Sequence, residues 1–419
     1  MAEKELKVVH ISTSFSGGAG TAAFRIHEAL LQSNYASSFL SLHTPANSNV
    51  TGCYQLQKPV KSLQRRAVDK FIRVSENRFD WKLSKKIYYS NRLKAISPFL
   101  HAEWTSLPFS NYNILDHPAV KEADIIHLHW VSGMLDYPSF FEKNTKLVIW
   151  TLHDMNPFQG IFHYKGDELR NAKAAKYLDR EIYSIKEDLI KKRSCEIAIV
   201  TPSKWLCETA SESGMFSGVK ATSIRNPING SQYFRQTGLI LRNRLGIPAK
   251  NTIFLFIAQD VNTYRKGFDL ITEALNQLDA RDITLLVIGV AGDFKMPHFQ
   301  TINLGSISDK HTLCSYYSLA DAFVIPSRED NLPNVMLEAM ACGTPVLSFN
   351  IGGMSETIED GFNGLKASQL NASSLKNILE QFILSKSQFN AAAISEFVIE
   401  NFSYPLVSEK YMKMYKSCF

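Results

Sequence analysis

The stretch SREDNLPNVMLEAMACGTPV, residues 327–346, combines acidic side chains with an apolar segment. Glu329 and Asp330 lie before Pro333, which suits the first turn of a helix, and Glu338 lies inside the predicted helix. A buried carboxylate without a partner is costly, whereas its two oxygens can bind two neighbouring hydroxyl groups. The pattern therefore predicts carboxylates that hold hydroxyl groups of a ligand.

Two cations, Arg265 and Lys266, precede Gly267 and a predicted helix in AQDVNTYRKGFDL, residues 258–270. Positive charge beside a helix N-terminus suits a diphosphate, because it stabilises the negative charge that grows when a diphosphate leaves. The alternative is an ordinary pair of solvated surface charges.

Gly17 and Gly18 lie in STSFSGGAG, residues 12–20, before another predicted helix. Glycines let a ligand approach the backbone closely and leave N–H groups free to bind an anion. The spacing does not match the dinucleotide-binding pattern GxGxxG, and a tight structural turn is the alternative.

His153 and Asp154 follow an apolar run in TLHDMNPF, residues 151–158. A histidine can donate to a sugar hydroxyl or a phosphate, and an aspartate can orient it or accept from a hydroxyl. Taken alone, a His-Asp pair after a strand more often has a structural role.

These candidates follow short apolar, β-branched runs that alternate with helical patterns, which predicts a doubly wound α/β fold. In such folds ligands bind at the carboxyl ends of the strands. The 419 residues suit two domains in tandem. We expect one domain over 1–225, a second domain over 226–395, and a closing helical piece over 396–419.

Together these segments resemble the large retaining family 4 of GT-B-fold glycosyltransferases. The most specific part is LEAMACGTPVLSFNIGGMSETIEDGFNG, residues 337–364, and the order of SGGAG, TLHD, RKG and EDNLPN agrees along nearly the whole chain. EDNLPN with TLHDMNPF is especially similar to members from bacterial surface-polysaccharide gene clusters. The resemblance implies two Rossmann-like domains that face a cleft, with the last helix crossing back to the N-terminal domain.

The resemblance also implies a role for each matching residue. Glu338 would bind the ribose, Lys266 the diphosphate, and the first carboxylate the donor sugar beside the backbone of Asn331 and Leu332. Gly17 and Gly18 would meet the diphosphate, and His153 would lie near the reacting sugar and the acceptor.

Two departures from the family pattern affect these roles. The family has Glu where Asp330 stands, so Asp330 and Glu329 both remain candidates for the first carboxylate. The usual Gly-Arg pair before the Lys-Gly loop is absent, and Arg265 is the candidate that replaces its arginine.

The implied reaction is a retaining hexosyl transfer from a nucleotide-diphosphate sugar, with UDP and GDP both open. The sequence contains no D-x-D motif, and cations with helix dipoles would take the place of a metal, so no cofactor is expected. No enzyme nucleophile is apparent, which favours front-face attack with the leaving diphosphate assisting deprotonation. Alternatives are a nucleotide-sugar epimerase and a non-catalytic subunit that binds sugar nucleotides.

Charge is concentrated between residues 55 and 100, where twelve Lys or Arg stand against three acids, a net charge of 12 − 3 = +9. Such a segment suits an anionic membrane surface or a phosphate-bearing acceptor, and a solvated helical excursion is the alternative. No nucleic-acid-binding motif accompanies it. We expect a cytoplasmic protein, peripheral at the membrane, that acts on a glycan or a polyprenyl-diphosphate-linked acceptor in O-antigen, capsule or exopolysaccharide synthesis. The N-terminus shows no signal-peptide pattern.

Overall fold

The chain forms two compact units in a computed structural model, which describes residues 6–43, 52–58, 81–290, 292 and 298–419. The N-terminal unit comprises the described residues up to Thr201 together with Cys207–Thr222 and Lys413–Phe419. The C-terminal unit comprises Pro202–Leu206 and Ser223–Met412. The main change of unit, between residues 222 and 223, lies close to the boundary expected after residue 225, and the last helix contributes to both units.

The N-terminal unit is built on a seven-stranded sheet in the order β3-β2-β1-β4-β5-β6-β7. Its recorded strand pairs are parallel. Residues of β1, β4, β5 and β6 are buried along almost their entire length, as expected for parallel strands covered on both faces. The strands are β1 Val8–Ile11, β2 Ser37–Ser41, β3 Cys53–Gln55, β4 Ile125–Leu128, β5 Leu147–Thr151, β6 Ile197–Thr201 and β7 Lys220–Ser223.

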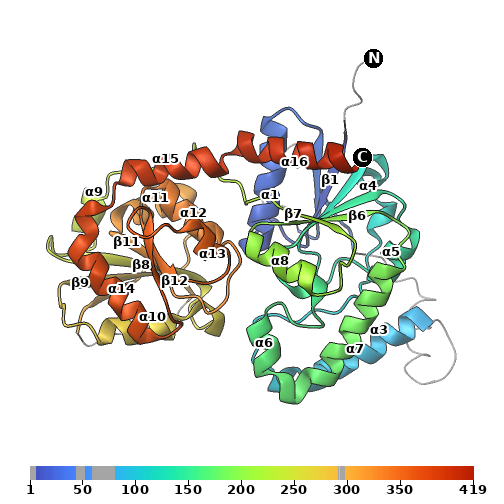
Figure 1. The fold of residues 1–419 in the computed structure, drawn as a ribbon, viewed down its shortest axis with the longest axis horizontal. Helices are drawn as coiled ribbons and strands as arrows, with labels where there is room; N and C mark the ends of the chain where they lie inside the picture. The colour runs from blue at the N-terminus through green and yellow to red at the C-terminus, as the bar shows by residue number, and fades with distance from the viewer. Residues whose placement is uncertain (1–5, 44–51, 59–80, 291, 293–297) are drawn as a thin grey trace. The chain divides into compact units, whose positions relative to one another are not determined.

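Helices flank this sheet (Figure 1). The longest, α7, presents an apolar face that buries Leu178, Ile182 and Ile190. The helices are α1 Gly17–Gln32, α3 Trp81–Ile96, α4 Pro118–Glu122, α5 Tyr137–Lys143, α6 Lys165–Arg170, α7 Ala172–Lys191 and α8 Lys204–Glu212. Residues 59–80 of the basic segment lie outside the described residues. In α3, Arg92 forms a two-pronged ion pair with Glu181 of α7, at 2.5 and 3.1 Å.

The C-terminal unit is built on a six-stranded sheet in the order β10-β9-β8-β11-β12-β13, again with parallel pairs. Alternate residues of β8 face opposite sides: Ile253 and Leu255 join one apolar core, and Phe254 and Phe256 join the other. The strands are β8 Thr252–Asp260, β9 Ile283–Val290, β10 Gln300–Asn303, β11 Ala322–Ile325, β12 Val346–Phe349 and β13 Gly364–Ala367.

Helices cover both faces of this second sheet, with α11 and α12 on one core and α10 and α14 on the other. The helices are α9 Leu239–Arg244, α10 Phe268–Asn276, α11 Lys310–Leu319, α12 Asn334–Ala341, α13 Gly352–Thr357, α14 Ala372–Ser385, α15 Ala391–Phe402 and α16 Tyr404–Cys418. Two parallel α/β units confirm the predicted fold class. No helix among the described residues is both long and apolar enough to cross a membrane.

The fold places every candidate loop after the carboxyl end of a strand. In the N-terminal unit, the glycine loop follows β1 and the His153 loop follows β5. In the C-terminal unit, the Arg265 loop follows β8 and the Asp330 loop follows β11, and these two strands are neighbours. Parallel neighbours end at the same edge, so the C-terminal unit brings its cations and carboxylates together.

Candidate functional site

The side chain of Asp330 lies between the two candidate cations of the C-terminal unit. Its Oδ2 is 2.6 Å from Lys266 Nζ and 3.1 Å from Arg265 Nη1, and Ser327 Oγ is 3.3 Å away. Its Oδ1 accepts the backbone N–H of Asn331. Asp330 and Arg265 are both buried. The structure thus brings three of the predicted site residues, Asp330, Arg265 and Lys266, into one ion-pair cluster.

Electrostatics keep Asp330 ionised inside this cluster. Burial alone would raise the pKa of Asp330, but Lys266 and Arg265 outweigh it and hold the pKa below its usual value. A second, outer pair joins Arg328 to the exposed carboxylate of Asp269, at 2.8 and 2.5 Å, and the guanidinium lies 3.9 Å from the centre of the Tyr264 ring.

Two glycines allow the loops of this cluster to approach closely. Gly267 has φ +71°, and a Cβ there would lie 1.9 Å from the carbonyl oxygen of Pro326. Gly352 has φ +55°, and its Cβ would lie 1.9 Å from the carbonyl oxygen of Asp330. Any other residue would push the loops apart at either position.

Glu338, the predicted ribose ligand, lies on α12 and is buried. The hydroxyl of Tyr317, from α11, donates to its Oε2 at 3.0 Å. Burial, with the nearby Glu338 carboxylate, raises the pKa of Tyr317 well above its usual value, so the hydroxyl stays protonated and able to donate. This partner of Glu338 was missed by the sequence analysis.

The residues between these carboxylates are held by neighbouring backbone and side chains. Glu329 is partly exposed, and its carbonyl accepts from Arg265 Nη1 at 3.0 Å. Asn331 Oδ1 accepts from Ser203 Oγ at 2.6 Å, and the carbonyl of Leu332 accepts from Asn226 Nδ2 at 3.3 Å. Of the two alternative first carboxylates, Asp330 forms ion pairs with Arg265 and Lys266.

In the N-terminal unit, Gly17 and Gly18 begin α1 and are exposed. Gly17 has φ +74°, and a Cβ at either glycine would meet no described atom within 4 Å. Gly20 is tight by contrast, since its Cβ would lie 2.6 Å from the carbonyl oxygen of Ser14. The first two glycines therefore leave open space around the backbone, as ligand binding would require.

His153 and Asp154 are adjacent in sequence, but their side chains bond to different partners. His153 Nε2 is hydrogen-bonded to His129 Nδ1 at 3.1 Å. Asp154 Oδ2 accepts from Trp130 Nε1 at 2.9 Å and bonds His163 Nδ1 at 2.6 Å, and its Oδ1 accepts the Asn156 N–H. Burial would raise the pKa of Asp154, but His163 and the backbone N–H hold it below its usual value. Asp154 thus organises the loop around His153.

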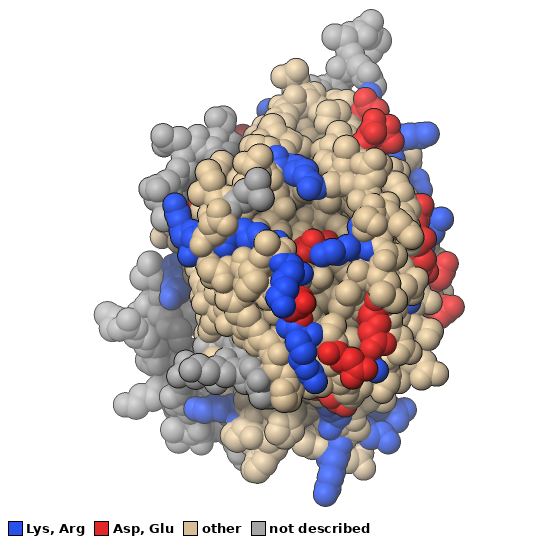
Figure 2. Space-filling model, turned by 90° about the vertical axis from the view of Figure 1, so that its left-hand side faces the viewer, with Lys and Arg blue, Asp and Glu red and all other residues tan. Residues whose placement is uncertain are grey.

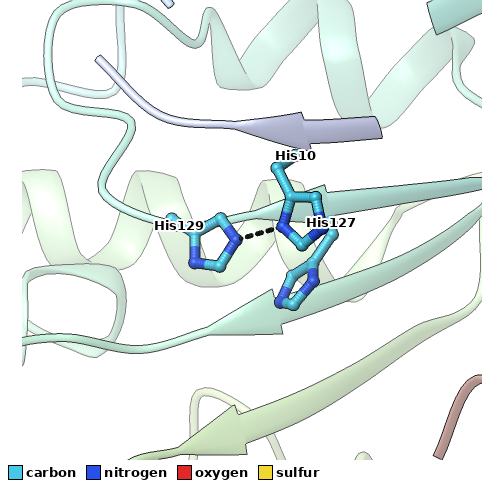
Figure 3. Close-up of side chains that lie close together, drawn as sticks. All are labelled: His10, His127 and His129. Carbon is cyan, nitrogen blue, oxygen red and sulfur yellow. Dashed lines mark hydrogen bonds between the residues drawn. The ribbon is translucent and has the colours of Figure 1, made fainter. Parts of the chain in front are cut away.

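Buried histidines extend behind His153. His10 Nδ1 is 2.9 Å from His129 Nε2 (Figure 3). His127 bonds Thr151 Oγ1 and the Tyr415 hydroxyl, both at 2.7 Å. Burial lowers the pKa of His10, His127 and His129 well below the usual value, and lowers that of His153 to about 4. The imidazoles are therefore neutral. The alternation of histidine with apolar residues in HLHW, residues 127–130, is the signal that could have revealed this array.

Lys186 anchors the loop that follows Asp154. Its buried ammonium donates to the carbonyls of Asn156, Gln159 and Gly160 at 2.6–3.1 Å. Burial lowers the pKa of Lys186 to about 7, although Asp179 and Asp154 act in the opposite direction. Nothing in the local sequence of α7 distinguishes this lysine from its exposed neighbours.

A separate pocket of about 360 Å³ lies in the C-terminal unit at the amino ends of β11 and β12. Asp330 lies at the opposite, carboxyl end of β11. Arg235, Arg242 and Lys386 line it together with Asp321. Figure 2 shows Lys and Arg side chains gathered near the middle of one face of the molecule. Two of these cations have structural partners, because Arg242 donates to three carbonyls and Lys386 lies 3.7 Å from Asp321.

Comparison with known structures identifies the class of fold. Sucrose-phosphate synthase from Thermosynechococcus elongatus matches with a TM-score of 0.67 over 98% of both chains at 17% identity. HepE from Anabaena, solved in complex with UDP-glucose, matches with a TM-score of 0.64 at 13% identity, covering 98% of this chain and 100% of that chain. The protein therefore has the GT-B fold.

Sequence comparison then shows which proteins parts of this chain are similar to. Residues 240–396 match the family model of glycosyl transferases group 1. A D-inositol 3-phosphate glycosyltransferase from Thermobifida fusca is 24% identical over 281 residues, 62% of this chain and 61% of that protein. A glycogen synthase from Thermodesulfovibrio yellowstonii is 27% identical over 177 residues, 40% of this chain and 35% of that protein. The chain thus spans less than two thirds of the length of these curated relatives.

Proposed function

We propose that the protein is a retaining glycosyltransferase that moves a sugar from a nucleotide-diphosphate sugar to a glycan or lipid-linked acceptor. The observation that carries the proposal is the match of residues 240–396 to the glycosyl transferases group 1 model. This span contains every donor-binding candidate of the C-terminal unit, from Arg265 to Glu338. The relatives named above are glycosyltransferases, and HepE was solved with UDP-glucose.

Within this proposal the C-terminal unit binds the donor. Glu338 holds the ribose hydroxyls, with Tyr317 fixing one of its oxygens. Lys266 and Arg265 hold the diphosphate, and their charge stabilises it as the sugar–phosphate bond breaks. Asp330 binds the donor sugar together with the backbone at Asn331 and Leu332, and Glu329 is the alternative ligand for the sugar.

The N-terminal unit contributes the acceptor-side groups. Gly17 and Gly18 present open backbone that suits the diphosphate, and His153 binds the reacting sugar or the acceptor. We propose retention of the anomeric configuration through front-face attack, with the leaving diphosphate accepting the proton of the acceptor hydroxyl.

The acceptor we propose is part of a bacterial surface polysaccharide, built on a polyprenyl-diphosphate carrier. The basic segment between Lys58 and Lys94 supports this choice, because clustered cations bind anionic lipid surfaces and phosphate-bearing carriers. Charge reversal of several of these residues should reduce flotation with anionic vesicles. The same changes at Lys173 and Lys176, which are exposed on α7, are the control. Equal flotation of all variants would remove the support for a membrane-bound acceptor.

A thermal-shift screen with UDP, GDP, ADP and their sugars tests the donor. A ligand that binds only the folded state at 100 times its Kd adds about 2.7 kcal/mol of stability and raises the Tm. Glu338→Ala should abolish the shift, whereas Glu400→Ala, on an exposed position of α15, should keep it. A full shift in Glu338→Ala would contradict the ribose assignment.

Turnover separates the proposal from its main alternative, a non-catalytic subunit. A purified transferase supplied with the right donor should release nucleotide slowly even without acceptor. Tight nucleotide binding with no release for any donor and acceptor would favour the non-catalytic subunit.

A further inference from the structure

The three histidines His10, His127 and His129 form a cluster whose ring nitrogens lie within 4.8 Å of one another, a spacing at which a metal ion is one explanation. Their contacts favour a different one. Both nitrogens of His127 are engaged by Tyr415 and Thr151. The rings of His10 and His129 are stacked at 18° and joined directly by a hydrogen bond, as the dashed line in Figure 3 marks. Hydrogen bonds therefore organise the cluster, one between His10 and His129 and two between His127 and hydroxyl groups.

One line of hydrogen bonds leads from the sheet interior to the proposed site. It runs from His10 on β1 to His129, just after β4, and then to His153 after β5. His10 and His129 are 0% and 2% exposed, and His153 is half-buried. The parallel register, which pairs His10 with His127, sets the histidines of neighbouring strands side by side.

Which nitrogen donates in each hydrogen bond of this line follows from the surroundings of His10, at the buried end. A neutral imidazole has one N–H and one lone pair, so each link needs one donor. His10 Nε2 has no partner among the described residues. If the protons pointed inward, Nε2 would carry a buried N–H without an acceptor, which proteins avoid more strictly than an unpaired acceptor. The His10 proton therefore sits on Nδ1 and is donated to His129 Nε2.

The same rule then fixes the next two rings. Since His129 Nε2 accepts, its proton lies on Nδ1 and is donated to His153 Nε2. The lone pair of His153 at Nε2 is thereby occupied, and its own proton lies on Nδ1. We propose that His129, oriented by His10, is a positioning residue that holds His153 as the Nδ1–H tautomer, so that His153 acts as a hydrogen-bond donor and not as a general base.

This inference rests on the proposed function for the role of His153 and has a consequence for the reaction. The acceptor proton cannot go to Nε2 of His153 without breaking the bond from His129. Another group must therefore accept this proton, which agrees with its transfer to the departing diphosphate.

Histidine tautomers can be read directly by ¹⁵N NMR on protein labelled only at histidine. His153 signals are assigned by comparison with His153→Gln. The expected spectrum shows a protonated Nδ1 and an unprotonated Nε2 for both His129 and His153. A protonated Nε2 on His153, or a stoichiometric metal bound by the three histidines, would overturn the proposal. The measurement needs no activity, so it stands even if the transferase proposal fails.

Variants at His129 test the positioning role. Leucine removes the donor to His153, and asparagine restores an N–H at a similar position to Nδ1. We expect His129→Leu to mix the His153 tautomers and to lower kcat roughly 10- to 100-fold with an unchanged donor KM, as seen when orienting partners are removed. His129→Asn should recover most of the tautomer and rate.

His127→Asn is the matched control, because His127 lies two residues before His129, on β4, and bonds Thr151 and Tyr415 instead. It should keep the His153 tautomer even where it lowers the Tm. If His129→Leu kept the wild-type kcat and tautomer, or if His127→Asn changed the tautomer equally, the line from His10 to His153 would have no positioning role.

Discussion

At the residue scale, the C-terminal unit contains two carboxylate–cation contacts of opposite character. Asp330 is buried with Arg265, whereas Asp269 is exposed beside Arg328. Removing one partner of a buried pair leaves an uncompensated charge, while an exposed pair contributes little because water screens it. Substitutions of Asp330 and Asp269 therefore compare the loss of a buried ion pair with the loss of an exposed one.

Asp330→Ala should destabilise the protein by about 3–5 kcal/mol, because Arg265 keeps its burial and loses its counter-charge. Asp269→Ala should change stability by less than about 1 kcal/mol. Urea unfolding of the two variants measures both values. Similar losses would mean that burial of Asp330 does not dominate its contribution.

At the element scale, a glycine allows the loops after β8 and β11 to pack closely against each other. Gly267 and Gly361 share a positive φ, +71° and +80°, but only Gly267 faces a carbonyl oxygen at 1.9 Å from where a Cβ would stand. Backbone strain is therefore common to both positions, and the steric clash is confined to one.

Gly361→Ala should cost about 1–2 kcal/mol, the price of the left-handed conformation for a residue with a side chain. Gly267→Ala should cost more than that, because the loop that carries Lys266 must move away from Pro326. Equilibrium unfolding gives the difference, and nucleotide binding should weaken only in Gly267→Ala. Equal costs would show that the loop adjusts freely.

The loops and strands were predictable to different degrees. The apolar runs TIFLFIAQ and ADAFVIPS and the breakers after them indicated strand ends, so the positions of Arg265, Lys266 and Asp330 at strand ends could be predicted from the sequence. The line of histidines could not, because it depends on which strands are neighbours and on their register. The same holds for Tyr317 and Lys186, whose partners are distant in sequence.

At the scale of the whole molecule, the buried histidines couple the fold to pH. Burial lowers the pKa of His27 and His153 to about 4, and it lowers the pKa of His10, His127 and His129 well below the usual 6.5. The unfolded chain therefore binds more protons than the folded chain below pH 6.5. Stability is expected to fall as pH drops from 6.5 toward 4, with the N-terminal unit affected most.

Thermal unfolding between pH 7 and 5, a range in which most carboxylates stay ionised, measures this effect. His27 alone should account for about 2 kcal/mol of the loss. His27→Asn removes that titration while keeping a polar group near Ser37, its partner at 2.8 Å. Its stability should depend less on pH than that of the wild type. A pH dependence identical to the wild type would exclude His27 as a contributor.

The contact of Asp330 with Lys266 and Arg265 bears on how the proposed donor site would respond to salt. The loop carries its own counter-ion, so under the proposed function an arriving nucleotide diphosphate would exchange partners with a resident carboxylate instead of meeting bare positive charge. Such an exchange releases few small ions, so nucleotide affinity should change only modestly between low and high ionic strength. The same resident carboxylate would repel inorganic phosphate, which has no ribose or sugar contacts to offset that repulsion, and so would keep the site available for the complete donor.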